Sequence, residues 1–574
     1  MKVCVAESAG FCMGVRKAMD CVVEAAQGNE ITFTLGPLIH NPQALKMLEY
    51  RNVYIAGDID ETLSGKTVVT RAHGITVHTR KRLNEVGALV VDATCPKVLR
   101  SQALIKKYNA QGYKVIIVGD IGHAEVNALL SYTDGTGTVI ETVEETTNLP
   151  HMGKVCVVAQ TTFNNEQYKR IAGEISKQAE ECYVAGTVCA ATERRQADIP
   201  KLAKITDATV VVGGKNSANT CRLAEISRDL GQPTYHVEDP TELDMKELLQ
   251  YNEIGVTAGA STPSWVIKQV VDSITGYTPD PHRSLVGFLM SIAFFAIEGN
   301  FVICAAAAAL TYAMSRLMSI PPELVFSLMS FFYLFPLHTI NKYLEINWKQ
   351  ISSEQQVNKL KGYWRIYLTI GFISFLISLL IAWYSSLLTF SLVAISYILG
   401  GLYSVRVIPE SWKIRFKSLR DIPGSKDVMT ATAWTFAVII LPAITYGVSP
   451  GFVPILMGSA FVFVLVFSRM TIHAIGDIQS DKLVGLETIP VLIGRENTLR
   501  LLYTATVLLA VAFSILTVIG HLRFSVLIFL IPVFYLLACI KFLSQKGSYF
   551  TLYHEVTLDA VFFLTGFLAL LFLR

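Results

Sequence analysis

The chain has 574 residues, with 49 Lys and Arg, 46 Asp and Glu and a formal net charge of +3. This length exceeds that of one ordinary domain and could hold three or four. No basic stripe with interleaved aromatic residues occurs, which argues against a nucleic-acid partner. The composition changes near residues 279–283: the segment up to His282 carries 28 basic and 33 acidic residues, and the rest carries 21 and 13. A basic, apolar second part is typical of a membrane domain with cationic cytoplasmic loops.

The first part alternates short apolar runs with charged helical patterns. Strands are predicted at residues 2–6, 31–35, 66–71, 88–92, 114–119, 154–160, 209–213 and 254–258. Helices are predicted at residues 97–110, 164–181, 220–230 and 263–274. This alternation predicts an α/β domain with parallel sheets, in which ligands bind beyond the carboxyl ends of the strands. The first residues look like the start of a strand and not like a signal peptide, so we expect this domain in the cytoplasm.

The second part consists of long apolar runs. We predict a domain at residues 1–278, a linker at 279–284, whose prolines cannot continue a helix, and a membrane domain at 285–574. Nine spans near the length needed to cross a bilayer are predicted at residues 285–313, 323–340, 363–383, 386–404, 428–447, 452–470, 501–520, 524–543 and 551–573.

Basic residues between the spans predict the orientation. They gather in the loops 341–362 and 405–427 and after the sixth span, where Arg469 and Lys482 are counted. By the positive-inside rule these loops are cytoplasmic. We therefore expect an integral protein of the cytoplasmic membrane, embedded in the lipid bilayer, with its N-terminal domain in the cytoplasm.

Three cysteines are distinguished by their Gly-, Pro- or small-residue surroundings: Cys12, Cys95 and Cys189, at spacings of 83 and 94 residues. Such spacing suggests three comparable α/β lobes that each donate one ligand. Soft thiolates favour zinc or an iron–sulfur cluster, and without a CxxC pair a structural zinc site is disfavoured. Three thiolates on a four-iron cluster would leave one iron open as a Lewis acid. The alternative is that all are ordinary buried thiols, and disulfides are not expected in a reducing cytosol.

Histidines and hydroxyls follow several predicted strands. The histidines are His40 in GPLIHNP, His73 in RAHG and His123 in GHAEV, the last with Glu125. Hydroxyls and amides come from the segments 161–162, 215–220 and 259–263. Such groups near helix starts can form a diphosphate cradle, although a Ser or Thr before a helix is often an N-cap alone.

Over residues 1–275 these motifs resemble those of the 4-hydroxy-3-methylbut-2-enyl diphosphate reductases, the LytB family: GPLIHNP, RAHG, DATCP, GHxEV, QTT and ASTP occur in order. The resemblance implies a trilobed α/β fold around a [4Fe–4S] cluster held by Cys12, Cys95 and Cys189, and a one-electron donor such as ferredoxin or flavodoxin. It implies that Glu125 supplies protons, helped by His123, and that Thr161 positions the substrate hydroxyl. The diphosphate pocket it implies is lined by His40, His73, His123, Thr161, Ser217, Ala218, Asn219 and Ser261.

The sequence departs from that family at two positions. Ala218 stands where a second serine is common, which would remove about 1–3 kcal/mol of substrate binding if a charged oxygen loses its donor. Gly186 stands where an asparagine is expected. Neither departure removes a cluster ligand.

After the sixth span, Asp477 and Asp481 lie four residues apart, and such hard carboxylates suit Mg²⁺ bound to a diphosphate. This DxxxD pattern and the nine spans resemble the UbiA-type prenyltransferases. In the first motif of that family only Asn341 and Glu345 remain as plausible ligands, because Lys342 and Lys349 stand where carboxylates are expected. The resemblance implies prenyl transfer to an unidentified acceptor, with Mg²⁺ as cofactor.

Two other classes of function are less consistent with the sequence. In one, the cluster senses redox state or diphosphate and a non-catalytic membrane domain anchors it; Glu125 argues against this, because a sensor needs no proton donor. In the other, the protein is a zinc hydrolase, which is disfavoured because the sequence lacks a clustered set of His and carboxylate ligands.

Overall fold

The computed structural model describes residues 2–26, 31–39, 42–275, 292–293, 295–352, 354–404, 422–446, 451–484, 488–545 and 552–573. The chain divides into two compact units, Met1–Tyr277 and Thr278–Arg574. Each unit is considered by itself below. The predicted linker at 279–284 lies outside the described residues.

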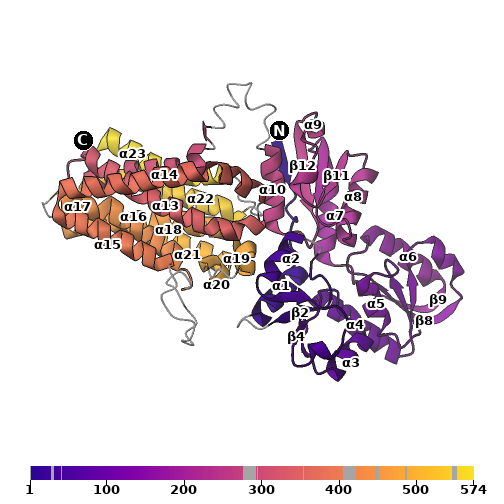
Figure 1. The fold of residues 1–574 in the computed structure, drawn as a ribbon. Helices are drawn as coiled ribbons and strands as arrows, with labels where there is room; N and C mark the ends of the chain where they lie inside the picture. Colours follow the sequence, from indigo (N-terminus) through magenta and orange to yellow (C-terminus); the bar gives the residue numbers. More distant parts are fainter. Residues whose placement is uncertain are drawn as a thin grey trace. The chain divides into compact units, whose positions relative to one another are not determined.

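The first unit contains three four-stranded parallel sheets, seen with their helices as three groups in Figure 1. The first sheet has the order β1 (Lys2–Val5), β12 (Glu253–Ala258), β10 (Ala208–Val212), β11 (Thr234–Val237). The second has the order β3 (Val53–Ile55), β2 (Thr32–Thr34), β4 (Thr67–Val69), β5 (Leu89–Val91). The third has the order β7 (Thr138–Ile140), β6 (Lys114–Val118), β8 (Met152–Ala159), β9 (Ala179–Val184). The predicted trilobed α/β class is therefore confirmed.

Helices connect the parallel strands, because a parallel pair cannot be joined by a tight turn. Their bounds are α1 (Met13–Ala25), α2 (Pro42–Glu49), α3 (Val77–Glu85), α4 (Pro96–Ala110), α5 (Ala124–Leu130), α6 (Asn165–Lys177), α7 (Ala190–Ala203), α8 (Ala218–Asp229), α9 (Met245–Leu248) and α10 (Ser264–Thr275). Short 3₁₀ turns lie at Glu61–Leu63, Glu144–Asn148 and Pro240–Glu242.

All eight predicted strands are present, and the four that were not predicted, β3, β7, β9 and β11, are edge strands. An edge strand is paired on one side and carries more polar side chains, so it lacks the continuous apolar run of a central strand. One helix prediction was too long. The predicted helix 164–181 ends at Lys177, and Glu181 lies in β9.

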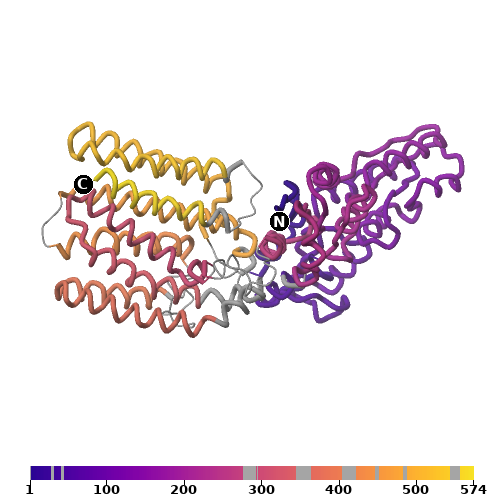
Figure 2. Tube along the Cα trace, turned by 90° about the horizontal axis from the view of Figure 1, so that it is seen from above, coloured from indigo at the N-terminus to yellow at the C-terminus, as the bar shows by residue number. Residues whose placement is uncertain are grey.

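The second unit is a bundle of apolar helices that run side by side in Figures 1 and 2. Their bounds are α12 (Phe301–Leu317), α13 (Leu324–Ser352), α14 (Glu354–Ser385), α15 (Leu387–Ser404), α16 (Ser425–Thr435), α17 (Leu441–Thr445), α18 (Phe452–Gly476), α19 (Ile478–Val484), α20 (Ile489–Ile493), α21 (Arg495–Val518), α22 (Leu530–Gln545) and α23 (Leu552–Phe572). A π-helical turn at Phe436–Ile440 joins α16 to α17, and a 3₁₀ turn at Phe524–Phe529 precedes α22.

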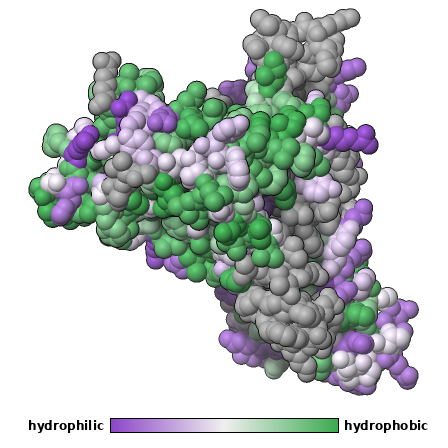
Figure 3. Space-filling view, turned by 60° about the vertical axis from the view of Figure 1, so that its left-hand side comes forward, coloured by the Kyte–Doolittle hydropathy of each residue, from purple (hydrophilic) through white to green (hydrophobic). Residues whose placement is uncertain are grey.

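Within the described residues, six helical segments are long and apolar enough to cross a membrane, and three shorter apolar helices lie at Phe301–Leu317, Leu387–Tyr403 and Val556–Phe572. Each predicted span overlaps one of these nine segments, but the count of nine crossings is not established. Large apolar side chains face outward on this unit, as Figure 3 shows, for example Phe372 at 62% and Ile398 at 63% exposure. Such a surface suits lipid, and this unit is embedded in a membrane.

The predicted loop 341–362 is largely helical. α13 continues to Ser352 and α14 begins at Glu354, so both helices extend beyond the predicted spans. Charge alone suggested a loop there, but Lys, Glu and Gln are good helix formers, and the segment holds no proline and no glycine before Gly362.

Candidate functional site

The three predicted cluster cysteines occupy equivalent places in the three lobes of the first unit. Cys12 is the N-cap of α1, Cys95 of α4 and Cys189 of α7. The positive end of a helix and its free N–H groups favour a thiolate over a thiol. The Val15 N–H, for example, donates to Cys12 Sγ at 3.4 Å. The other cysteines of this unit lie inside strands or helices: Cys4, Cys21, Cys156, Cys182 and Cys221.

The backbone of each cysteine is held in the same way. The N–H of Cys12 donates to the Ala260 carbonyl at 3.0 Å, that of Cys95 to Ala72 at 2.9 Å and that of Cys189 to Thr161 at 2.9 Å. Each acceptor is itself a predicted pocket residue or the neighbour of one, since Ala260 precedes Ser261 and Ala72 precedes His73. The thiols and the polar pocket are therefore built from the same strand ends.

The donor set fits a cluster of several metal ions. A Cβ added to Gly14 would lie 2.6 Å from Cys95 Sγ and 3.8 Å from Cys12 Sγ, so the sulfurs of two lobes approach the same glycine. Burial raises the pKa of the Cys95 thiol, the backbone N–H groups of Lys97 and Val98 lower it, and the charges of Cys12 and Cys189 raise it slightly. Soft thiolates are the ligands that proteins use to hold iron–sulfur clusters. Within the described residues, no three His, Cys, Asp or Glu side chains are close enough to hold a single metal ion.

Glu125 and Thr161 form the buried polar pair of the site. Glu125 is 1% exposed at the start of α5. Its carboxylate accepts the Thr161 N–H at 2.7 Å and the Thr161 hydroxyl at 2.9 Å. Burial raises the pKa of Glu125 to about 7, while the two bonds from Thr161 lower it and the charge of Asp120 raises it. A carboxyl group with a pKa near neutral pH can both hold and release a proton under physiological conditions.

Two of the three predicted histidines meet across lobes. The rings of His73 and His123 pack edge to face, with centroids 5.3 Å apart. His123 is the N-cap of α5, and its Nδ1 accepts the Glu125 N–H at 3.1 Å, which leaves Nε2 to carry the proton of the neutral ring. The predicted His40 lies outside the described residues.

The segment around the start of α8 presents unsatisfied polar groups. Ser217 is the N-cap and Ala218 the first residue of α8, and Ser217 and Asn219 are 7% and 5% exposed. Neither amide atom of Asn219, Oδ1 or Nδ2, has a hydrogen-bond partner among the described residues. A buried amide without partners is costly unless a ligand satisfies it. Ser261 is partly buried after β12, the neighbour of β10 in the first sheet.

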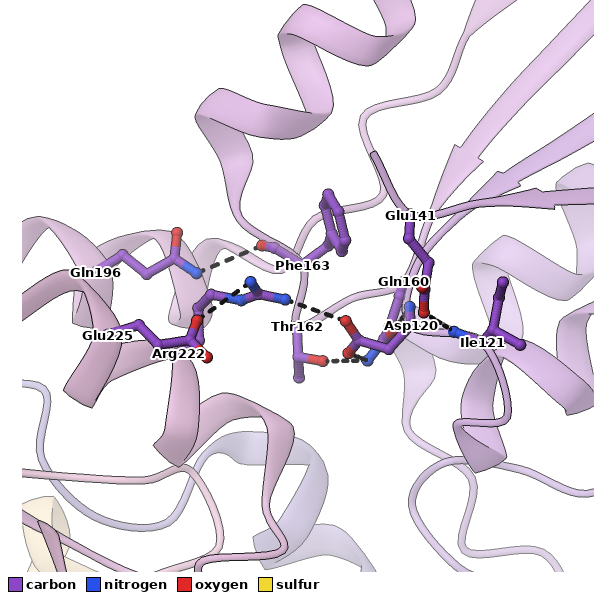
Figure 4. Close-up of polar contacts among 9 residues, drawn as sticks. All are labelled: Asp120, Ile121, Glu141, Gln160, Thr162, Phe163, Gln196, Arg222 and Glu225. Carbon is purple, nitrogen blue, oxygen red and sulfur yellow. Dashed lines mark hydrogen bonds and ion pairs between the residues drawn. The ribbon is translucent and has the colours of Figure 1, made fainter. Parts of the chain in front are cut away.

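A charged network that was not predicted joins α8 to the third lobe (Figure 4). Arg222 of α8 donates to Asp120 Oδ1 at 3.1 Å, and its guanidinium lies over the Phe163 ring at 5.4 Å. Fully buried Gln160 donates to Asp120 Oδ2 at 3.1 Å and accepts the Asp120 N–H at 2.8 Å. In the sequence Arg222 is indistinguishable from any basic residue on a helix face, because its partner lies 102 residues away.

In the membrane unit the DxxxD pair forms one helical turn. The Asp481 N–H donates to the Asp477 carbonyl at 2.8 Å, and Asp481 Oδ2 accepts the Thr488 hydroxyl at 3.2 Å. Asn341 is an exposed residue of α13. Glu345 is in the same helix, but its side chain lies outside the described residues, as does that of Lys349.

Two basic residues of the membrane unit, Lys342 and Arg469, form ion pairs in the structure. Lys342 is not a free cation for a diphosphate, because it forms an ion pair with the Glu298 carboxylate and donates to the Glu298 carbonyl at 2.7 Å. Arg469 does not belong to a loop after the sixth span. It lies inside α18 and forms a two-point ion pair with Asp559 of α23, with Nη2 to Oδ2 at 3.1 Å, so its charge is neutralised.

Comparisons with known proteins find relatives for both halves of the chain. The LytB protein family model matches residues 3–275, and the UbiA prenyltransferase family model matches residues 364–570. The 4-hydroxy-3-methylbut-2-enyl diphosphate reductase of Geobacter sulfurreducens is 42% identical over 274 residues, which cover 48% of this chain and 97% of that protein.

Two solved structures are also similar to parts of the chain. A structure of (E)-4-hydroxy-3-methyl-but-2-enyl diphosphate reductase is 38% identical, covers 48% of this chain and 100% of that one, and has a TM-score of 0.39. A UbiA homolog from Archaeoglobus fulgidus bound to GPP and Mg²⁺ is 17% identical, covers 48% of this chain and 98% of that one, and has a TM-score of 0.34. From the sequence matches, the chain belongs to the LytB family through its first half and contains a UbiA prenyltransferase family domain in its second half.

Proposed function

We propose that the first unit is the enzyme that reduces 4-hydroxy-3-methylbut-2-enyl diphosphate to isopentenyl and dimethylallyl diphosphate. The observation that carries this proposal is the position of the acid. Glu125 is buried, is hydrogen-bonded to Thr161, and through the Thr161 carbonyl is connected to the backbone of Cys189. A proton donor with a pKa near 7 therefore lies beside a proposed cluster ligand.

Cys12, Cys95 and Cys189 would hold a [4Fe–4S] cluster. When bound, such a cluster supplies electrons singly and has one iron without a protein ligand that acts as a Lewis acid. The protein side chains have the remaining tasks: to bind the diphosphate, to orient the hydroxyl and to deliver protons.

The reaction consumes two electrons and two protons and releases the allylic hydroxyl as water. In our proposal the Thr161 hydroxyl orients the substrate oxygen, and Glu125 gives it the proton with which it leaves, with the help of His123. The second proton is added to one of two carbons of the allylic unit, and this choice decides which of the two products forms.

The diphosphate would bind to the polar groups around the start of α8. In our proposal the buried Asn219 Nδ2 donates to a diphosphate oxygen, and Ser217, Ser261, His40, His73 and His123 complete the pocket. The backbone N–H groups at the start of α8 add positive potential there. Ala218 contributes no hydroxyl, so we expect weaker diphosphate binding than a serine would give.

The test is anaerobic purification in detergent, followed by turnover of the substrate with reduced methyl viologen as one-electron donor. We expect both five-carbon diphosphates. Cys189→Ser should abolish turnover and change the visible absorption of the cluster, whereas the control Cys182→Ser on the edge strand β9 should do neither. Wild-type protein with full iron and sulfide but no turnover would refute the proposal and favour a sensor.

For the second unit we infer prenyl transfer to an unidentified acceptor. Asp477 and Asp481 are proposed to bind the diphosphate of the donor through Mg²⁺, together with Asn341 and Glu345 from α13. The turn that holds both aspartates supports this, since carboxylates on one turn can share a cation. Asp477→Asn should abolish Mg²⁺-dependent transfer and leave the reductase unchanged; equal loss of both activities would contradict independent units.

The location is inferred from charge. We propose that the membrane is the cytoplasmic membrane and that the reductase unit is in the cytoplasm, where a one-electron donor such as ferredoxin or flavodoxin would reduce it. Arg469 no longer supports this orientation, but the six basic residues between Arg406 and Lys426 still do. Protease accessibility of the first unit in sealed inverted vesicles tests it.

A further inference from the structure

We propose that Arg222 is a positioning residue of the reductase, which links the diphosphate-binding start of α8 to the Glu125–Thr161 acid through Asp120. This inference rests on the proposed function of the first unit. Among the described residues, the recorded side-chain contacts of Arg222 are with Asp120, Glu225 and Phe163, and these are neither proposed cluster ligands nor proposed substrate groups.

The geometry places Arg222 between two parts of the site. Arg222 lies three residues after Asn219 on α8, so both lie on neighbouring positions of the same helix face. Its guanidinium leaves the first lobe and meets Asp120, at the end of β6 in the third lobe, at 3.1 Å (Figure 4). The same guanidinium packs over Phe163, two residues beyond Thr161. The position of α8 is therefore fixed against the segment that carries Thr161.

Asp120 connects Arg222 to the segment that holds Glu125. One carboxylate oxygen accepts from Arg222 and the other from Gln160, which is fully buried and directly precedes Thr161. Gln160 also donates to the Thr162 hydroxyl at 2.9 Å, so its side chain is fixed on three sides. A displacement of Asp120 would consequently move the backbone that donates to Glu125.

The link is also electrostatic. The negative charge of Asp120 raises the pKa of Glu125, and Arg222 is the cation that offsets that charge. Among the described residues, His123 lies at the start of the same helix and accepts the Glu125 N–H, and His73 from the second lobe packs against His123. Removal of the Arg222 charge should therefore raise the pKa of Glu125 further, because the Asp120 carboxylate loses its counter-charge. Removal of the Asp120 charge should lower that pKa.

The experiment compares variants of the full chain, purified anaerobically in detergent, by kcat, KM and the pH dependence of kcat/KM. We expect Arg222→Gln to raise KM about fivefold, the effect of losing one partly buried ion pair. We also expect it to move the high-pH limit of activity upward. Asp120→Asn should move that limit downward. The double variant should have the same limit as Asp120→Asn alone, because without the Asp120 carboxylate the guanidinium has no charge to offset.

The matched control is Glu225→Gln. Glu225 also accepts from Arg222, at 3.3 Å, but it is an exposed neighbour on the same helix and contacts no other lobe among its recorded contacts, so we expect wild-type kinetics. In Arg222→Lys the high-pH limit of activity should lie between those of the wild type and Arg222→Gln, because lysine keeps the positive charge. An Arg222→Gln profile equal to that of Glu225→Gln, or shifted in the same direction as Asp120→Asn, would overturn the inference. If the wild-type protein shows no turnover of the substrate, the proposed function itself is refuted.

Discussion

Replacement of Thr161 by valine tests the central pair of the site. Valine has nearly the shape of threonine but lacks the hydroxyl that donates to Glu125 at 2.9 Å, while the backbone bond at 2.7 Å remains. A hydrogen bond to a charged group contributes about 1.5–3 kcal/mol. Since one pKa unit corresponds to about 1.4 kcal/mol, its loss should raise the pKa of Glu125 by roughly one to two units.

The sign of the effect on activity follows from the role of the acid. Glu125 must be protonated to act, so activity falls as pH rises through its pKa, which is about 7 in the wild type. In Thr161→Val we expect this fall at a higher pH, together with a plateau about tenfold lower because the carboxyl group has lost one of the two bonds that orient it.

The assay measures kcat/KM under anaerobic conditions between about pH 5.5 and 9, a range that extends to both sides of a near-neutral pKa. Thr161→Ser, which keeps the hydroxyl, is the control and should have the wild-type profile. If the valine variant keeps the wild-type limit, or loses activity at a lower pH, Glu125 is not the titrating acid.

Three further outcomes are expected. Ala218→Ser should lower KM by about fivefold, the value of one regained hydrogen bond, in the same turnover assay. Asp559→Asn should destabilise the membrane unit by about 3 kcal/mol, because it leaves Arg469 as a buried charge without its carboxylate; thermal unfolding in detergent measures this. Because burial raises the pKa of Glu125 from 4.5 to about 7, the reductase unit should lose about 3 kcal/mol of stability as pH rises between those values and none above. Glu125→Gln should remove that loss, and calorimetry of the solubilised chain at pH 5 and pH 8 compares the two proteins.

Much of the fold could be predicted from local patterns. Central strands such as β6 and β8 are continuous apolar runs, because parallel strands are buried on both faces. Four of the six edge strands could not be found this way. β9, for example, has the sequence AEECYV, is largely exposed, and its first residues continue the helical pattern of α6. The extension of α13 past the membrane was missed for a related reason, since charged residues are equally compatible with a loop and with a solvated helix.

The sequence by itself was enough to single out the candidate site residues. Cys12, Cys95, Cys189, Glu125 and Thr161 all follow strands, and parallel sheets bring such positions to one edge. It also determined that the second half is apolar enough for a membrane, because this depends on composition alone.

Only the tertiary structure decided how charges are paired. Lys342 stands where the UbiA-type family has a carboxylate, and in the structure it pairs with Glu298, 44 residues earlier in the chain. Arg222 had no assigned role until its contact with Asp120 was seen. Whether a charge is free or neutralised depends on the side chain that faces it from another element, and no local pattern encodes that distance. The raised pKa of Glu125 has the same origin, since burial is a property of the packed lobes and not of the segment that contains the residue.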